Sequence, residues 1–129
     1  MLRGRHLRFD GLSHRVIGCA IEVHQCLGPG LLESTYQKCL AHELSLAGIP
    51  FRSQFPLPVQ YKGIELDCAY RIDFLIQDRM VVELKAVDQI LPIHLAQLLT
   101  YMKLSGIRAG LLMNFNVKRL ADGIRRMVL

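Results

Sequence analysis

The sequence predicts an α/β (α+β) fold in which helices flank a central sheet, and three observations support this prediction. Apolar residues recur at three- and four-residue steps before residue 50, follow a two-residue period across much of 51–86, and return to the helical period after Pro92. Glycine and proline residues that form turns separate these stretches. The expected order is helix, helix, three strands, helix, strand, helix, within a single domain that spans residues 13–129.

The first half of the chain predicts two amphipathic helices after a basic segment at residues 1–12. Ser13 is a suitable N-cap for a helix that ends at Leu27, because Gly28-Pro29-Gly30 follows at once. A second helix is expected from Leu31 to Ala47, where the next residue, Gly48, is the C-terminal signal.

Three antiparallel strands are expected between the second and third helices. Pro56 and Pro58 cannot donate hydrogen bonds to a ladder, so the strand that contains them is expected at an edge. The later elements are a turn at Lys62–Gly63, a strand at Ile64–Ile76, a turn at Gln77–Arg79 and a strand at Met80–Ala86. Because short turns join them, we expect an antiparallel meander.

The last third of the chain predicts a helix, a buried strand and a final helix. Pro92 suits the first turn of a helix that ends before Ser105-Gly106. Residues Arg108 to Phe115 are apolar enough to form a buried strand. From Val117 to Met127, apolar residues spaced by three or four favour a last helix.

The composition limits the function classes without selecting one of them. The formal charge of +5 and the pI near 9.3 are compatible with a polyanionic ligand, but many basic proteins bind no nucleic acid. Although the hydrophobic fraction is 51% and the mean hydropathy +0.25, no apolar run approaches the ~18 residues that span a bilayer. We therefore expect no membrane partner. A subunit interface, such as that of a homodimer, would explain the apolar excess.

The cysteines and the N-terminus bear on the compartment. The four cysteines contain no C-x-x-C pair, which argues against a zinc site and a disulfide framework; they are Cys19, Cys26, Cys39 and Cys68. We expect reduced and mostly buried thiols. The basic residues near Met1 are followed by no apolar stretch or cleavage site of a secretory signal, so a cytoplasmic location is expected.

Three charged residues within apolar strands carry the chemical prediction. Glu83 and Lys85 are two residues apart, so on a strand their side chains share one face, about 6–7 Å apart. Asp73 lies ten residues before Glu83, and a turn at 77–79 would bring the two carboxylates side by side. Adjacent carboxylates repel one another unless a cation lies between them.

A divalent cation is the simplest way to satisfy that pair. Mg²⁺ or Mn²⁺ prefers oxygen ligands and keeps several waters, one of which can act as the nucleophile. The Lys85 ammonium can orient or help deprotonate this water and offset charge on phosphoryl oxygens. The alternative is a buried ion pair of Lys85 with Glu83 or Asp73 that has no chemical role.

The same residues resemble a known signature. Asp73, followed by Glu83-Leu84-Lys85, resembles the D…(D/E)xK pattern of the PD-(D/E)xK, or restriction-endonuclease-like, nuclease superfamily. Three more segments are similar to the small GxxExxY protein family within it: Ile21–His24, Leu27–Tyr36 and Leu112–Asn116. The similarity covers about Ser13 to Val128. Ile72 departs from the superfamily pattern, because it occupies the place of the proline, which bears no ligand.

The resemblance implies a restriction-endonuclease-like αβββαβ core with a central mixed sheet. It also implies that Asp73 and Glu83 are metal ligands, that the Leu84 carbonyl is a third, and that Lys85 is the catalytic lysine. Glu33 would project from the preceding helix toward the same site as a further ligand. Three residues after Gly30, however, Glu33 could equally complement the positive end of its own helix.

Two residues of the third helix also resemble a nuclease element. Gln97 and Tyr101, four residues apart on one helix face, resemble the QxxxY element of nucleases similar to the RecB exonuclease domain, where it lines the substrate phosphate or supports the lysine. His94 shares that face or is a surface or core residue. His24 competes with Glu33 as a ligand from the first helices, and Glu33 ranks first.

The leading function predicted is hydrolysis of nucleic-acid phosphodiester bonds, with DNA as the expected substrate and Mg²⁺ or Mn²⁺ as the cofactor. The alternative is a binding module that keeps the nuclease architecture and holds nucleic acid or a protein partner without turnover. A purely structural oligomer would bind neither metal nor DNA.

Overall fold

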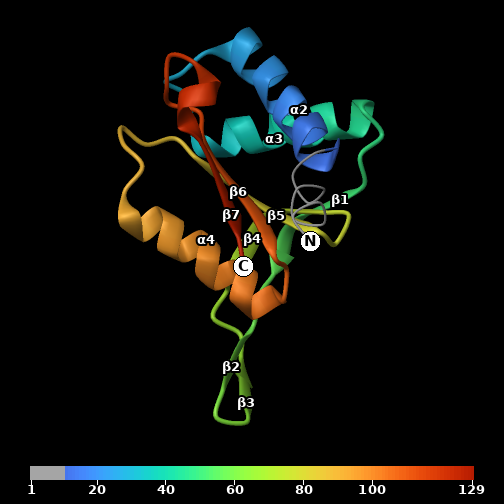
Figure 1. Cartoon of the computed structure of the whole chain (residues 1–129), viewed down its shortest axis with the longest axis vertical. Coiled ribbons are helices and arrows are strands. Elements are labelled where there is room, and N and C mark those ends of the chain that lie inside the picture. The colour runs from blue at the N-terminus through green and yellow to red at the C-terminus, as the bar shows by residue number, and fades with distance from the viewer. Residues whose placement is uncertain (1–10) are drawn as a thin grey trace.

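The computed structural model describes residues 11–129, in which three α-helices surround a five-stranded sheet (Figure 1). In chain order, the elements are α2 (Gly11–Leu27), α3 (Glu33–Leu46), β1 (Phe51–Pro56), β2 (Val59–Tyr61), β3 (Ile64–Leu66), β4 (Arg71–Ile76), β5 (Met80–Lys85), α4 (Pro92–Ser105), β6 (Ala109–Asn114), the 3₁₀ helix η1 (Leu120–Gly123) and β7 (Ile124–Val128). The predicted α+β class and central mixed sheet flanked by helices are confirmed. The predicted basic segment lies outside the described residues except for Gly11 and Leu12, which belong to α2.

The sheet has the strand order β1-β4-β5-β6-β7. All neighbouring strands pair antiparallel except β5 and β6, which are parallel. Two parallel neighbours cannot be joined by a tight turn, and α4 supplies the crossover between them. The carboxyl ends of β5 and β6 therefore meet at one end of the sheet, where Lys85 pairs with Asn114.

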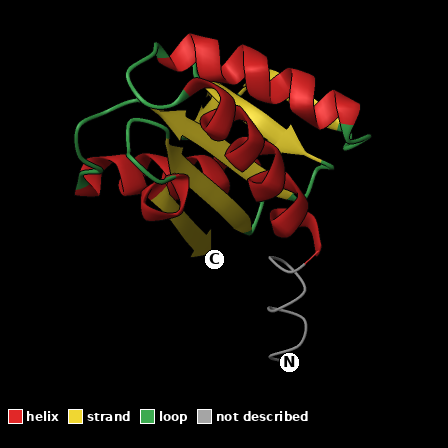
Figure 2. Ribbon diagram, turned by 90° about the horizontal axis from the view of Figure 1, so that it is seen from above, coloured by secondary structure: helices red, strands yellow, loops and turns green. Residues whose placement is uncertain are grey.

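Helices cover the sheet on both faces (Figure 2). On one face, α2 and α3 pack over the larger apolar cluster, which contains fully buried Leu40 and Met113. On the other face, α4 packs over a smaller cluster around Leu98 and Leu112. Alternation along the central strands explains this division, since Leu112 and Met113 are sequence neighbours that point to opposite faces.

The predicted three-strand meander is wrong in one part. Residues 59–66 leave the main sheet and form a separate hairpin of β2 and β3, which projects from the body of the protein (Figure 1). The strand predicted from Ile64 to Ile76 is therefore two strands, β3 and β4. Ala69 has a φ of 61° at the bend between them. β1 is an edge strand, as the prolines predicted.

The predicted last helix is also wrong, because Val117–Met127 contains η1 and the start of β7. Ile124 packs against the cluster under α2 and α3, whereas Met127 packs against the cluster under α4. An edge strand that contributes to both faces thus produced a spacing that also fits a helix. Gly123 fits the observed structure, because this segment passes so close to β6 that a Cβ at Gly123 would lie 2.3 Å from the Asn114 carbonyl oxygen.

Smaller predictions need correction as well. Ser13 is not an N-cap: it is buried inside α2, and its hydroxyl has no hydrogen-bond partner among residues 11–129. The second helix is shorter than predicted at both ends. All four cysteines are free, but they are not mostly buried, because Cys26 and Cys68 are exposed and the other two are half-buried. Among the described helices, none has the length and apolar character that crossing a membrane requires.

Candidate active site

Asp73 and Glu83 face each other where the ladder between β4 and β5 ends. The last paired residues are Phe74 and Val82. Beyond them, the Asp73 backbone N–H donates to Glu83 Oε2 over 2.8 Å, and the Leu84 N–H donates to Asp73 Oδ2 over 2.8 Å. Both carboxylates are buried. Side-chain oxygens have replaced the main-chain acceptors of the ladder, and this fixes the position of one oxygen of each carboxylate.

Asp73 lies at a point where β4 changes the face to which its side chains point. Ile72 packs under α4, but Phe74, two residues later, packs under α2 and α3. Regular strand geometry would put both on one face. The pairing of β4 with β1 is interrupted at the same point, opposite Gln54, which has a φ of 51°. This local irregularity frees Asp73 from both ladders and turns its carboxylate toward Leu84.

Burial and mutual repulsion dominate the electrostatics of the pair. Burial, followed by the charge of Asp73, raises the pKa of Glu83 to about 8, against the lowering effects of the Asp73 N–H and of Lys85. Burial also raises the pKa of Asp73, while the hydrogen bond from Leu84 and the charge of Lys85 oppose that rise. A cation between the carboxylates would remove the repulsion that raises the pKa of Glu83.

Lys85 is held by α4 rather than by an ion pair. Its Nζ donates to Gln97 Oε1 over 2.9 Å, and Gln97 Nε2 donates to the Tyr101 hydroxyl over 3.2 Å. In residues 11–129, the ion pairs found are Arg52–Asp78 and Arg71–Asp67, so the alternative of a buried ion pair of Lys85 is wrong. The Gln97–Tyr101 pair supports the lysine and leaves its charge uncompensated by direct contact with a carboxylate.

Glu33 begins α3 and lies near the same charges. Burial raises its pKa most, Asp73 raises it further, and Lys85 lowers it. Tyr36 explains how the loop before Glu33 is fixed: its hydroxyl donates to the Gly28 carbonyl over 2.6 Å and accepts from the Leu31 N–H over 3.2 Å. Gly30 has a φ of 97° in this loop, which few other residues adopt. The G-x-x-E-x-x-Y spacing therefore holds the start of α3.

The family comparison agrees with this geometry. A profile of the PD-(D/E)XK nuclease superfamily matches residues 10–127. The chain belongs to this superfamily. No curated protein and no solved structure matches the chain. Three helices around the five-stranded mixed sheet are consistent with the restriction-endonuclease-like fold. Assignment to the smaller GxxExxY family stays a prediction.

The two histidines have different roles in this PD-(D/E)XK domain. His24 is buried, shares a 2.8 Å hydrogen bond through Nε2 with the Val117 carbonyl, and lies against Phe115. It thus joins α2 to the loop after β6. His94 accepts the Leu91 N–H on Nδ1 over 2.9 Å and lines the same cavity as Lys85 and Gln97. Glu33, which interacts with the charges of Asp73 and Lys85, stays ahead of His24 as a site residue.

Several residues that the sequence did not single out contact the site of this nuclease-superfamily domain. The side-chain amides of Gln54 and Gln37 lie close enough to Asp73 to lower its pKa, and Gln54 Nε2 donates to Gln37 Oε1 over 2.8 Å. Asn114 is buried and exchanges hydrogen bonds with both backbone groups of Val87, which fixes the chain just after Lys85. Asn114 is the polar last residue of an otherwise apolar strand, and this position was the available signal for it in the sequence. Gln37, four residues after Glu33, had a weaker one.

The donor set fits an ion that takes few protein ligands. In the described part of the chain, no group of three or more His, Cys, Asp or Glu side chains is arranged to hold a metal ion, so Glu33 does not complete a preformed cluster with Asp73 and Glu83. Mg²⁺ uses one or two carboxylates and keeps several waters. Two adjacent carboxylates, each with one oxygen fixed by a backbone N–H, match that requirement.

Proposed function

We propose that this protein is a metal-dependent nuclease that hydrolyses phosphodiester bonds, with DNA as substrate and Mg²⁺ or Mn²⁺ as cofactor. The observation that carries the proposal is the position of Lys85, whose ammonium is held by Gln97 beside the buried Asp73–Glu83 pair. A lone buried carboxylate pair would be costly, and a structural lysine would pair with it directly. The arrangement is instead typical of a site that binds both a cation and an anion.

Asp73 and Glu83 would hold the ion through their oxygens, with the Leu84 carbonyl as a further ligand. Glu33 would join them only after its side chain moves toward the pair, since the three carboxylates do not form a preformed cluster. When bound, a divalent ion lowers the pKa of a coordinated water and offsets negative charge on the phosphate. Gln97 orients the Lys85 ammonium through the 2.9 Å hydrogen bond, and Tyr101 orients Gln97 in turn. The ammonium of Lys85 is then available to stabilise the negative charge that develops on a phosphoryl oxygen.

The direct test is cleavage of plasmid and of single-stranded DNA with and without Mg²⁺ or Mn²⁺. Lys85→Ala and Asp73→Asn should each abolish cleavage, and a chelator should abolish it in the unchanged protein. Lys103→Ala is the matched control, since Lys103 is an exposed lysine in the last turn of α4 that does not line the cavity beside Lys85. Cleavage that persists in both site variants, at wild-type rates and with the fold intact by circular dichroism, would falsify the proposal.

A second candidate is a binding module without turnover, and one observation favours it. Each carboxylate already accepts a backbone N–H, so the pair also serves to join β4 and β5. Such a module would bind DNA with an affinity that falls steeply with salt, as expected for phosphate contacts, and would cleave nothing under either metal.

The proposal includes a homodimer. Apolar side chains of the projecting hairpin are exposed, including Tyr61 and Ile64, which are 55% and 53% accessible. A two-stranded hairpin has little stability of its own, and contact with a second subunit would bury this surface. Sedimentation velocity tests this directly, and a monomer at all concentrations would exclude the dimer.

A further inference from the structure

A cavity of about 680 Å³ opens beside Lys85, between α4 and the base of the hairpin. Its volume lies within the range of small-molecule sites. Tyr70 and Tyr101 form its aromatic walls, with ring centroids 6.1 Å apart, while Leu104 and Ile93 are apolar. Lys85 belongs to the lining, so the cavity is continuous with the candidate active site.

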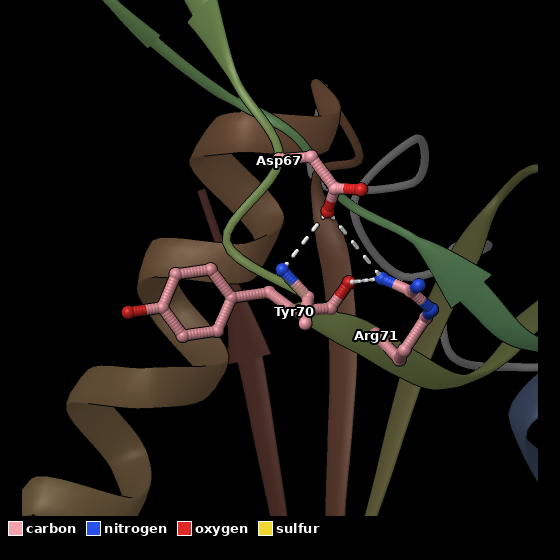
Figure 3. A network of polar contacts seen from close by, with 4 residues as sticks. Asp67, Tyr70 and Arg71 are labelled. Carbon is pink, nitrogen blue, oxygen red and sulfur yellow. Dashed lines mark hydrogen bonds and ion pairs between the residues drawn. The ribbon is translucent and has the colours of Figure 1, made fainter.

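The chain before β4 holds Tyr70 in a defined position at this cavity. Asp67 Oδ1 accepts the Ala69 N–H over 2.9 Å and lies 4.0 Å from Arg71 Nη1, which donates to the Tyr70 carbonyl over 2.9 Å. Figure 3 shows this network on one side of the segment and the Tyr70 ring on the other, toward α4. Ala69 adopts a φ of 61°, an unusual conformation for a residue with a Cβ. The bend therefore presents a tyrosine that stays 45% exposed.

We propose that this cavity receives an unstacked base, and that the substrate is therefore single-stranded nucleic acid or an unpaired strand end. The inference rests on the proposed nuclease function, because that function gives Lys85 a phosphate to contact. A base attached to a phosphate at Lys85 reaches the neighbouring cavity, where the Tyr70 face supplies the stacking surface. A base within a duplex is stacked and paired, and cannot enter a cavity without leaving the helix.

Polar groups on the cavity wall suit the edge of a base. Because His94 Nδ1 accepts the Leu91 N–H, a neutral ring carries its proton on Nε2, which is then a donor. Thr100 adds a hydroxyl that can donate or accept. Aromatic faces with few polar groups bind bases without strong sequence preference. We therefore expect a preference for unpaired strands rather than for one sequence.

The test measures binding, not cleavage, so that it is independent of turnover. A labelled single-stranded oligodeoxynucleotide and its blunt duplex are titrated with the full chain at low salt in chelator, by fluorescence anisotropy. The single strand should bind more tightly than the duplex. Tyr70→Ala should weaken single-strand binding by about tenfold, whereas Tyr70→Phe, which keeps the ring, should stay within about twofold.

Leu46→Ala is the control, because Leu46 is an exposed apolar residue at the end of α3 that belongs neither to the cavity nor to the hairpin. The inference is overturned if Tyr70→Ala and Leu46→Ala weaken binding equally, if the duplex binds as well as the single strand, or if neither binds. It is also overturned if Tyr70→Ala changes only the sedimentation of the protein, because the cavity would then be an interface between copies.

The two proposals fail in different ways. Selective binding of the single strand through Tyr70, combined with no cleavage under Mg²⁺ or Mn²⁺, would reject the proposed nuclease activity and support the proposed base-binding cavity. Cleavage of single strands that depends on Lys85 but is insensitive to Tyr70→Ala would reject the base-binding cavity and support the nuclease activity.

Discussion

The two faces of the sheet differ in how completely their helices seal them. Under α2 and α3, the larger cluster is closed, and side chains such as Val16, Leu40 and Leu44 have no accessible surface. Under α4, the cluster is smaller, and a 680 Å³ cavity separates part of the helix from the hairpin. Gln97 and Tyr101 of α4 make polar contacts there. The first face is closely packed, whereas the second is packed incompletely and leaves an open cavity beside Lys85.

This division has a cause in the central strands. Val82 and Leu84 point to the sealed face, while Val81 points toward α4, and Glu83 and Lys85 alternate in the same sense. A charged side chain on the sealed face would have no partner and no water. The open face is the one place in this sheet where Glu83 and Lys85 can be buried among hydrogen-bonding groups.

Stability measurements on one leucine from each face give the clearest test of this difference in packing. Leu40→Ala, on the sealed face, should lower the free energy of unfolding by about 2–5 kcal/mol, because a fully buried side chain leaves a cavity. Leu104→Ala, at the rim of the existing cavity, should lower it by less than about 1 kcal/mol. Urea unfolding measures both. Equal losses would mean that the faces are packed alike.

The pH dependence of the metal-free protein tests the cost of the charged pair. The pKa of Glu83 rises from 4.5 to about 8 on folding, so its contribution to stability is fully present below pH 4.5 and is lost as the pH rises to about 8. The loss is on the order of a few kcal/mol. Glu83→Gln should flatten this part of the curve, and Glu65→Gln, on the exposed hairpin, should not. Stability that rises over this range would contradict the sign.

Divalent cations should raise the free energy of unfolding, because they offset the repulsion between the Asp73 and Glu83 carboxylates. At an ion concentration about 100 times the dissociation constant, unfolding should require about 2.7 kcal/mol more, if the ion binds only the folded state. Thermal unfolding with and without Mn²⁺ measures the effect. Asp73→Asn keeps an oxygen that can accept the Leu84 N–H but removes the charge, so the Mn²⁺ effect should vanish. An unchanged shift would place the ion elsewhere.

The loop before α3 provides a smaller test on the sealed side. Tyr36→Phe removes the hydroxyl that joins Gly28 and Leu31, and it should cost about 0.5–1.5 kcal/mol because two part-buried hydrogen bonds are lost. Stacking of the ring on Phe115 should persist. If Glu33 contributes to the site, the cleavage rate of the folded Tyr36→Phe protein should also fall, because the start of α3 that carries Glu33 is held less firmly. A loss of stability without any change in cleavage would limit Glu33 to a structural role.

The sequence predicted best those features that depend on neighbours along the chain. The spacing of Asp73 and Glu83 around the turn at 77–79 predicted adjacent carboxylates, and the hydrogen bond from the Asp73 backbone N–H to Glu83 Oε2 agrees with it. The spacing of Gln97 and Tyr101 predicted a shared helix face, and their hydrogen bond agrees. Local periodicity is sufficient for both, since each pair lies within one hairpin or one helix.

The features that it missed depend on contacts distant in sequence. Ile124 and Met127 have a helical spacing, but the free edge of β6 pairs with this segment and makes it a strand. The approach of Gln54 and Gln37 to Asp73 requires β1, β4 and α3 to be in place. The place of Tyr70 at the cavity could not be predicted, because it depends on the separation of the hairpin from the sheet and on the bend at Ala69, which directs the ring toward α4.

The two hydrogen bonds at the end of the β4–β5 ladder also affect which residues related chains would keep after losing activity. If the proposed nuclease activity is correct, a related chain that has lost it would still need oxygen acceptors at the positions of Asp73 and Glu83, because the N–H groups of Asp73 and Leu84 are otherwise left without partners. Acidic or amide residues would persist there after the chemistry had gone. Lys85 has no comparable duty beyond Gln97. Among related chains, the residue at position 85 should therefore distinguish active from inactive nucleases better than the residues at positions 73 and 83 do.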